Sequence, residues 1–177
     1  MKEETNSHLL EVNNIEVVYN DIIQVLRGVS LNVPQGSIVA LLGTNGAGKS
    51  TVLKTVMGLI EDQPDKGTIE FKGQRIDGKD TDKIVRLGIS YVPEGREVFE
   101  ELSVKENLLM GAYTRKDRHN VASDFDRVYS YFPVLKERHN QWAGTLSGGE
   151  RNRLMLARLF TRPSAVVSVG TTWMLLR

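Results

Sequence analysis

The clearest chemical pattern in the sequence is a glycine-rich run at 43–50, GTNGAGKS, which matches G-x-x-x-x-G-K-[ST]. Glycines let the backbone curl so that successive amides point at phosphate oxygens. Lys49 supplies a positive charge for the β- and γ-phosphates of a nucleotide, and the Ser50 hydroxyl suits Mg²⁺. An ordinary glycine-rich turn is the alternative. The predicted phosphate contacts are Gly43, Thr44, Asn45, Gly46, Ala47, Gly48, Lys49, Ser50 and Thr51.

A second pattern is the run LSGGE at 146–150. Ser147 and Glu150 have the spacing of a capping box, so a well-capped helix is one explanation of the run. A cap does not need Gly148 and Gly149, however, and two consecutive glycines suit close approach of the backbone to another group. A phosphate at the N-terminus of the following helix is such a group.

Together, GTNGAGKST and the LSGGE that follows about a hundred positions later resemble the nucleotide-binding domain of ABC-type ATPases. The resemblance extends over 9–163. It implies ATP and Mg²⁺ as cofactors, and a head-to-tail dimer with a second ATPase subunit that is either identical or different. It also implies a segment that acts in trans, on ATP held by the phosphate loop of the second copy. The residues of this segment are Ser147, Gly148, Gly149 and Glu150.

Two more positions take a role from the resemblance. Tyr19 stands where the family places an aromatic side chain that stacks on adenine, and a half-buried strand tyrosine is the alternative. Glu94 stands at the glutamine position of a loop that contacts Mg²⁺ and the transporter, so the implied metal contacts are Ser50 and Glu94. A solvated loop carboxylate is the alternative for Glu94. The run VPEGR, with VLRGVSL upstream and ENLLMGAY downstream, is similar to the ATP-binding subunits of branched-chain amino-acid importers.

The sequence departs from the family after position 163. There the family has an Asp that holds Mg²⁺ through water and a Glu that orients the attacking water, but Val169 and Gly170 stand near those positions. No Asp or Glu follows Glu150, and the family's later histidine has no counterpart. Loss of one catalytic group commonly costs a factor of about 10²–10⁴, so no complete catalytic site is predicted. A truncated or frameshifted gene near Ser164 is the hypothesis that explains this departure.

The motifs need elements that position them. Apolar alternation predicts strands over 9–19 and 24–33, and a short apolar run over 37–42 predicts a buried strand directly before the phosphate loop. A hairpin is predicted over 67–77 and a further strand over 89–92. Ser103 and Glu106 form a capping-box spacing that opens a helical stretch to position 138. Helices are predicted over 49–59, 82–87, 121–132 and 150–161.

The predicted fold class is α/β: a P-loop NTPase (RecA-like) core with an antiparallel β subdomain and a helical subdomain, incomplete at the C-terminus. One nucleotide-binding domain spans 1–177, with its core at 8–93 and 141–170. The helical subdomain at 94–140 would receive the membrane subunits, and its charge run at 115–119 is predicted to be solvated. An atypical tail occupies 164–177, and the missing last strands would leave an open sheet edge.

Composition narrows the function classes. The 23 basic and 22 acidic residues give a net charge of +1, which argues against a nucleic-acid partner held by bulk charge. The absence of cysteine excludes a thiolate metal site or thiol nucleophile. The favoured interpretation is the ATP-binding subunit of an importer, bound through permease subunits at the cytoplasmic face of the inner or plasma membrane. A module that binds ATP without turnover is the alternative. An ABC-type protein of DNA repair or translation ranks last, because those proteins carry two nucleotide domains or long insertions.

Overall fold

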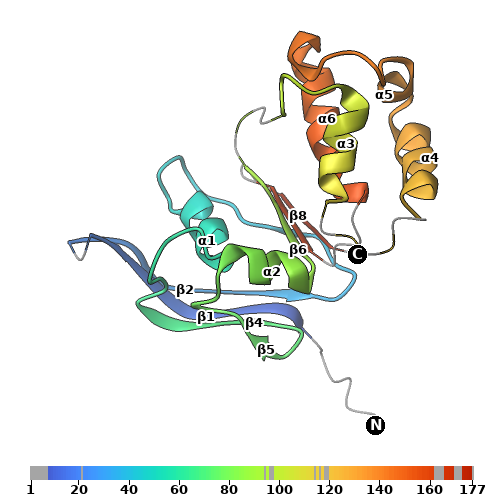
Figure 1. Cartoon of the computed structure of the whole chain (residues 1–177). Coiled ribbons are helices and arrows are strands. Elements are labelled where there is room, and N and C mark those ends of the chain that lie inside the picture. The colour runs from blue at the N-terminus through green and yellow to red at the C-terminus, as the bar shows by residue number, and fades with distance from the viewer. Residues whose placement is uncertain are drawn as a thin grey trace. The chain divides into compact units, whose positions relative to one another are not determined.

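The computed structural model describes residues 8–20, 22–93, 95, 98–113, 115, 117, 120–161, 166–169 and 173–176, the last two ranges by their backbone only. It divides into two units. One holds the described residues up to Tyr91 together with the two strands of the tail, and the other runs from Val92 to the end of the helical stretch. Figure 1 shows both along the chain.

The first unit contains an antiparallel sheet in the strand order β2-β1-β4-β5. Its register pairs Leu10 with Phe71 and Val12 with Ile69, so the apolar sets of β1 and β4 share one face. All four of these side chains are buried, as the alternation of the sequence predicts. The strands are β1 (His8–Tyr19), β2 (Ile23–Pro34), β4 (Lys66–Phe71) and β5 (Gln74–Arg75).

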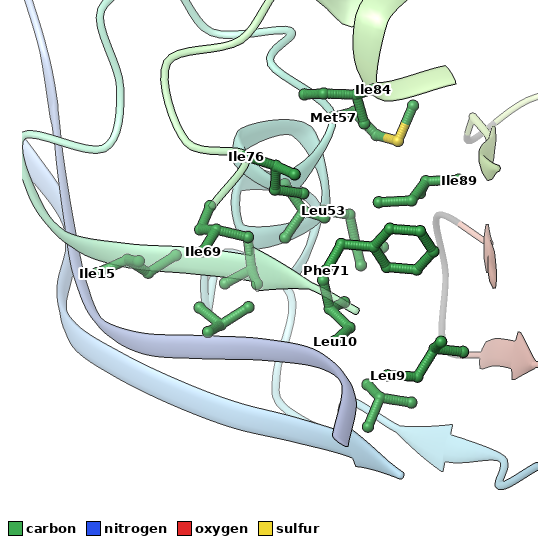
Figure 2. Close-up of a cluster of buried hydrophobic side chains, with 14 of the residues drawn as sticks. Leu9, Leu10, Ile15, Leu53, Met57, Ile69, Phe71, Ile76, Ile84 and Ile89 are labelled. Carbon is green, nitrogen blue, oxygen red and sulfur yellow. The ribbon is translucent and has the colours of Figure 1, made fainter. Parts of the chain in front are cut away.

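Two helices, α1 (Lys49–Val56) and α2 (Thr81–Leu87), cover that apolar face. Figure 2 shows Leu53 of α1 and Ile84 of α2 in the same apolar layer as Phe71 of β4. Each helix ends where a glycine takes positive φ, at Gly58 and Gly88, which are the stops that the sequence indicates. This packing fixes α1, whose first residue is Lys49 of the glycine-rich run.

A second sheet of this unit has the strand order β3-β8-β7-β6. Its strands are β3 (Val39–Ala40), β6 (Ile89–Val92), β7 (Val166–Val169) and β8 (Trp173–Leu176). Only three residues join β7 to β8, so the two pair as an antiparallel hairpin, because a parallel connection needs a dozen or more residues. β8 then pairs with β3, antiparallel, opposite Val39 and Ala40.

The tail adds two strands to this sheet, in which the described strands β3 and β6 lie at the two edges. The two strands β7 and β8 lie in the part of the sequence that departs from the family, and no strand was predicted over β8. Within the part of the chain that the structure describes, β8 pairs with one side of β3, and no strand pairs with the other side. An unpaired strand edge carries unsatisfied backbone groups, which any nearby extended segment can satisfy.

The second unit is helical. Its elements are α3 (Val104–Gly111), α4 (Val121–Tyr131), α5 (Pro133–Glu137), the 3₁₀ turn η2 (Ala143–Thr145) and α6 (Gly148–Phe160). Pro133 occupies the first turn of α5, where its missing N–H costs nothing. The structure differs from the expected division at 141–161, because α6 buries Leu154 and Ala157 in one cluster with Val104 and Leu108. The helix after LSGGE thus belongs to the helical unit.

The charge run at 115–119 was predicted to be solvated, and this is wrong at Arg115, whose side chain is only 6% exposed. Its guanidinium contacts the carboxylates of Asp117 and Asp124 and donates to the Thr161 carbonyl at 2.9 Å. Arg127 pairs with Asp124 at 2.8 Å and donates to the Phe160 carbonyl at 3.0 Å. Two guanidinium groups thus satisfy the last carbonyls of α6, which a helix end leaves without intrahelical partners.

Candidate functional site

The phosphate loop at 43–50 connects β3 to α1. Gly46 and Gly48 have φ values of 83° and 86°, a backbone region that favours glycine. The loop from Gly43 to Ala47 is exposed, and one backbone hydrogen bond, from the Ala47 N–H to the Thr44 carbonyl at 3.2 Å, turns it back on itself. Gly48 is the N-cap of α1 and no side chain caps the helix there, so the first amides of α1 face the loop.

Lys49 brings the charge of this loop. Its Nζ donates to the carbonyls of Gly43 and Thr44, at 2.8 Å in both cases. An ammonium has three N–H donors, and these two bonds hold it across the loop that the glycines form. A positive charge, an uncapped helix N-terminus and an exposed glycine loop therefore coincide, and this donor set fits the phosphates of a nucleotide.

Besides its positive φ, close packing is a second reason why position 48 requires glycine. A Cβ built there would lie 2.6 Å from Cδ2 of Leu26, and 3.7 Å from the Val25 carbonyl oxygen. The start of α1 therefore lies against β2 at positions 25 and 26. This close approach links the phosphate loop to the neighbouring antiparallel sheet.

Tyr19 lies at the end of β1, in the same unit, and is half-buried. It pairs with Ile23 at the start of β2, two residues before Val25, and its carbonyl accepts the Ile22 N–H at 3.1 Å. Strand β2 thus contacts Gly48 and also contains Ile23, the strand partner of Tyr19. Ile22 and Ile23 are 84% and 61% exposed, so an apolar surface adjoins this turn. The adenine-stacking role of Tyr19 stays a prediction.

The remaining phosphate-loop residues are placed as follows. Thr44, Asn45 and Ala47 are exposed in the loop, and Ser50 and Thr51 are half-buried in the first turn of α1. The Thr51 carbonyl accepts the Thr55 hydroxyl at 2.8 Å. Among the described residues, no group of three or more acidic or histidine side chains could hold a metal ion alone. Glu94, the other implied metal contact, lies outside the described residues.

The LSGGE segment opens α6, with Ser147 as the N-cap. The expected capping box is confirmed: Ser147 Oγ accepts the Glu150 N–H at 3.4 Å, and Glu150 Oε2 accepts the Ser147 N–H at 2.9 Å and its hydroxyl at 2.8 Å. The Ser147 N–H bond, then the hydroxyl bond, lower the pKa of Glu150, with a smaller effect from Arg138. The Arg138 Nε lies 3.1 Å from Glu150 Oε1.

Gly148 and Gly149 form the first turn of α6, and Gly149 has no positive φ. A Cβ built at Gly149 would meet nothing nearer than Arg153 Nη1, at 3.8 Å. Neither a backbone conformation nor packing within this chain therefore requires glycine at 149, and this agrees with a surface that another group approaches closely. The capping-box explanation and the phosphate explanation of this segment are compatible.

Sequence reasoning missed two side chains of the helical unit that bond the backbone of its loops. Asn107 is fully buried, and its amide bonds both the N–H and the carbonyl of Phe99, at 2.9 Å each. Arg151 bonds Glu100 and the carbonyls of Gly144 and Leu146. Glu100 lies 51 positions from Arg151, and no local pattern signals that pair.

The comparison with known families settles what these motifs belong to. The sequence pattern described as ABC transporter matches residues 26–168, most of the chain, including both glycine-rich segments. The chain belongs to the ABC transporter family. It is 43% identical over 161 residues to the high-affinity branched-chain amino acid transport ATP-binding protein BraG of Pseudomonas aeruginosa. It is 36% identical over 149 residues to the sulfate/thiosulfate import ATP-binding protein CysA of a Synechocystis species.

Coverage is high on this chain and lower on its relatives. These alignments cover 90% and 83% of the chain, but 67% and 40% of the two relatives. A solved structure titled "Structure of ATP binding subunit of ABC transporter" superposes with a TM-score of 0.80 at 29% identity, over 91% of this chain and 65% of that one. The expected α/β class of ABC ATPase domains is thereby confirmed. Among the described residues, no helix has the length and apolar character that a membrane crossing requires.

Proposed function

We propose that this chain is an ATP-binding subunit of an ABC importer for branched-chain amino acids. The observation that carries ATP binding is the uncapped start of α1 beneath an exposed glycine loop, with Lys49 held across it. The substrate rests on the name of the P. aeruginosa relative and on the likeness of VPEGR and ENLLMGAY to that subgroup. The sulfate/thiosulfate relative shows that the family's cargo varies, so the substrate needs its own test.

In this proposal each residue of the loop has a defined task. The amides of 44–49 and the dipole of α1 bind the β- and γ-phosphates, and Lys49 exchanges loop carbonyls for phosphate oxygens. Ser50 and Glu94 hold Mg²⁺, which supplies charge neutralisation for the bound phosphates. Tyr19 stacks on the adenine ring, beside the exposed turn that carries Ile22 and Ile23.

The proposed partners are a second ATPase subunit, identical or different, and integral membrane permease subunits. Ser147, Gly148, Gly149 and Glu150 contact the γ-phosphate of the ATP that the partner subunit holds. The helical unit receives the permease, which places the chain at the cytoplasmic face of the inner or plasma membrane. The balanced net charge of +1 offers no support for a nucleic-acid partner.

A second candidate, ATP binding without turnover, is favoured by one specific observation. Phosphoryl transfer needs a positioned Mg²⁺ and a positioned water, and the family uses an Asp and a Glu for them. At 164–172 this sequence reads SAVVSVGTT, which has no acidic residue. The chain would then bind ATP and dimerise but hydrolyse it only with groups supplied by another subunit.

The test is titration of the purified full chain with MgATP by calorimetry, followed by measurement of phosphate release. The expected result is that Lys49→Ala weakens MgATP binding about 100-fold. Lys54→Ala, which removes an exposed cation from the same helix, should retain the wild-type affinity. Binding without phosphate release selects the second candidate. Affinity weaker than a Kd of about 1 mM in the wild type would overturn both. Copurification with branched-chain amino-acid permease subunits, and not with other permeases, tests the substrate.

A further inference from the structure

The backbone that leads into α6 is held by one side chain, Arg151, from the first turn of that helix. Its Nε donates to the Leu146 carbonyl at 3.1 Å, and its Nη2 donates to the Gly144 carbonyl. Its Nη1 pairs with Glu100 Oε1 at 2.6 Å. A guanidinium is a rigid planar fork, so three bonds in three directions fix the three points relative to one another.

The segment that Arg151 holds is also tied to residues 100–102 by backbone bonds. The Gly144 N–H donates to the Glu100 carbonyl at 3.0 Å, and the Ala143 N–H donates to the Leu102 carbonyl at 2.9 Å. A Cβ at Gly144 would lie 3.1 Å from both the Cβ and the carbonyl oxygen of Glu100, so these two segments of the chain are in close contact. Arg151 closes this arrangement from the helix side.

The carbonyl bonds of Arg151 matter more than its ion pair. The Glu100 side chain is 60% exposed, and an exposed ion pair contributes little to stability. Arg151 itself is only 23% exposed, and the Leu146 carbonyl that it binds belongs to the residue directly before the N-cap Ser147. The orientation of that peptide decides where the Ser147 hydroxyl and the amides of Gly148 and Gly149 point.

We propose that Arg151 is a positioning residue for the contact in trans: it fixes the backbone at 144–147 so that Ser147, Gly148 and Gly149 meet the phosphates held by a second copy of this chain. This inference rests on the proposed function. A glutamine here would have one amide group with two donors and could not make three divergent donor bonds.

The proposal predicts a split between two measurements on the full chain. Arg151→Ala keeps MgATP affinity within about twofold, because the phosphate loop is untouched. ATP-dependent dimerisation weakens at least about tenfold, which corresponds to about 1.4 kcal/mol and is no more than one hydrogen bond to a charged phosphate contributes. Arg151→Lys and Arg151→Gln give intermediate losses. Lys105→Ala, which removes an exposed positive charge from the same unit, dimerises as the wild type does.

Mixing two defective copies separates positioning from general damage. Arg151→Ala retains its phosphate loop, and Lys49→Ala retains its LSGGE segment. A mixture of the two, labelled with different fluorophores, should form heterodimers with one intact composite site, at a protein concentration where each variant alone is mainly monomeric in sedimentation with MgATP. Damage to the fold of the Arg151 variant beyond its own LSGGE segment would prevent this complementation.

The outcomes distinguish the two proposals. Wild-type chain that fails to bind MgATP, or binds it and fails to dimerise, overturns the proposed function and this inference with it. Wild-type chain that dimerises together with an Arg151→Ala variant that dimerises equally well overturns the inference alone. An Arg151→Ala variant that loses MgATP affinity, or that Lys49→Ala does not complement, also overturns it, because its effect then reaches beyond the LSGGE segment.

Discussion

Residues 43–49 and 146–150 are both glycine-rich, and each segment contains the N-terminus of a helix, α1 in the first and α6 in the second. At α1 the N-cap is Gly48, in a left-handed conformation and without a side-chain cap. At α6 the N-cap is Ser147, in an extended conformation, and Glu150 completes a capping box. Two segments of similar composition thus differ in what satisfies the first amides of the helix.

The difference teaches how each segment can use an anion. A helix N-terminus attracts negative charge, and α1 has no acidic residue in its first turn to supply it. The N-terminus of α6 already carries the Glu150 carboxylate, which Arg138 neutralises in part at 3.1 Å. The uncapped first segment therefore suits the proposed binding of phosphates within its own chain. The second is stable by itself, and its Ser147 hydroxyl must turn from Glu150 to donate to a ligand.

The largest effect should come from the charge of the phosphate loop. Lys49→Ala should weaken MgATP binding about 100-fold, because a hydrogen bond to a charged group contributes about 1.5–3 kcal/mol. Ser147→Ala should leave the same affinity within about twofold, since its contact lies in the other subunit's site. Isothermal titration calorimetry on both variants checks this. Equal losses in the two variants would show that both segments serve one chain's nucleotide, and the comparison would fail.

The glycines themselves provide the next test. Gly48→Ala should lower the free energy of unfolding by about 2 kcal/mol or more, because Ala at φ 86° is strained and its Cβ would meet Leu26 at 2.6 Å. Gly149→Ala should raise it by about 0.5–1 kcal/mol, since Gly149 lies in helical backbone with open space around it. Urea unfolding of both variants measures the two signs. A stabilised Gly48→Ala variant would contradict the assigned conformation of the phosphate loop.

Features that depend on neighbouring residues could be predicted from the sequence, and features that depend on distant contacts could not. The phosphate loop, the glycine stops of α1 and α2 and the boxes at Ser103 and Ser147 depend on neighbouring residues, so their spacing alone indicates them. A strand was predicted over 37–42, but β3 covers only Val39–Ala40, and its partner β8 lies near the end of the sequence. Strand length depends on such pairing, which single-sequence periodicity does not contain.

Distant contacts account for the other differences. The burial of Arg115 depends on Asp124 and on the end of α6. A charge run is indeed usually solvated, but the carbonyls of Phe160 and Thr161 needed donors, and the guanidinium groups of Arg127 and Arg115 supply them. The placement of α6 in the helical unit has the same origin, in apolar contacts with α3.

The two capping boxes of the helical unit allow a matched test of whether Ser147 does more than cap a helix, with a smaller expected change in stability. Ser103 and Glu106 cap α3 with the same bonds that Ser147 and Glu150 make at α6. Ser103→Ala and Ser147→Ala should each lower stability by about 1 kcal/mol, as loss of an N-cap does. Only Ser147→Ala should also weaken dimerisation in MgATP, as sedimentation velocity would detect. Equal effects of both variants on dimerisation would reduce the role of Ser147 to a helix cap.

The smallest expected effect is a dependence on pH. Hydrogen bonds lower the pKa of both glutamates, the Ser103 hydroxyl being the main cause at Glu106 and the Ser147 N–H at Glu150. A carboxylate with a lowered folded pKa stabilises the protein above its unfolded value, near 4.3, and the stabilisation is lost as pH falls through the folded value.

Urea unfolding between pH 6 and pH 3 should therefore show stability falling below about pH 4.5, with the slope set by such carboxylates. Ser103→Ala should flatten this fall more than Ser147→Ala, because the Ser147 variant keeps the backbone N–H that dominates at Glu150. Lys49→Ala should leave the slope unchanged, since α1 has no carboxylate at its start. A Lys49 variant that alters the slope as much as the Ser103 variant would mean that the phosphate loop is coupled to a titrating acid after all, and that α1 is not the uncapped helix on which the ATP site depends.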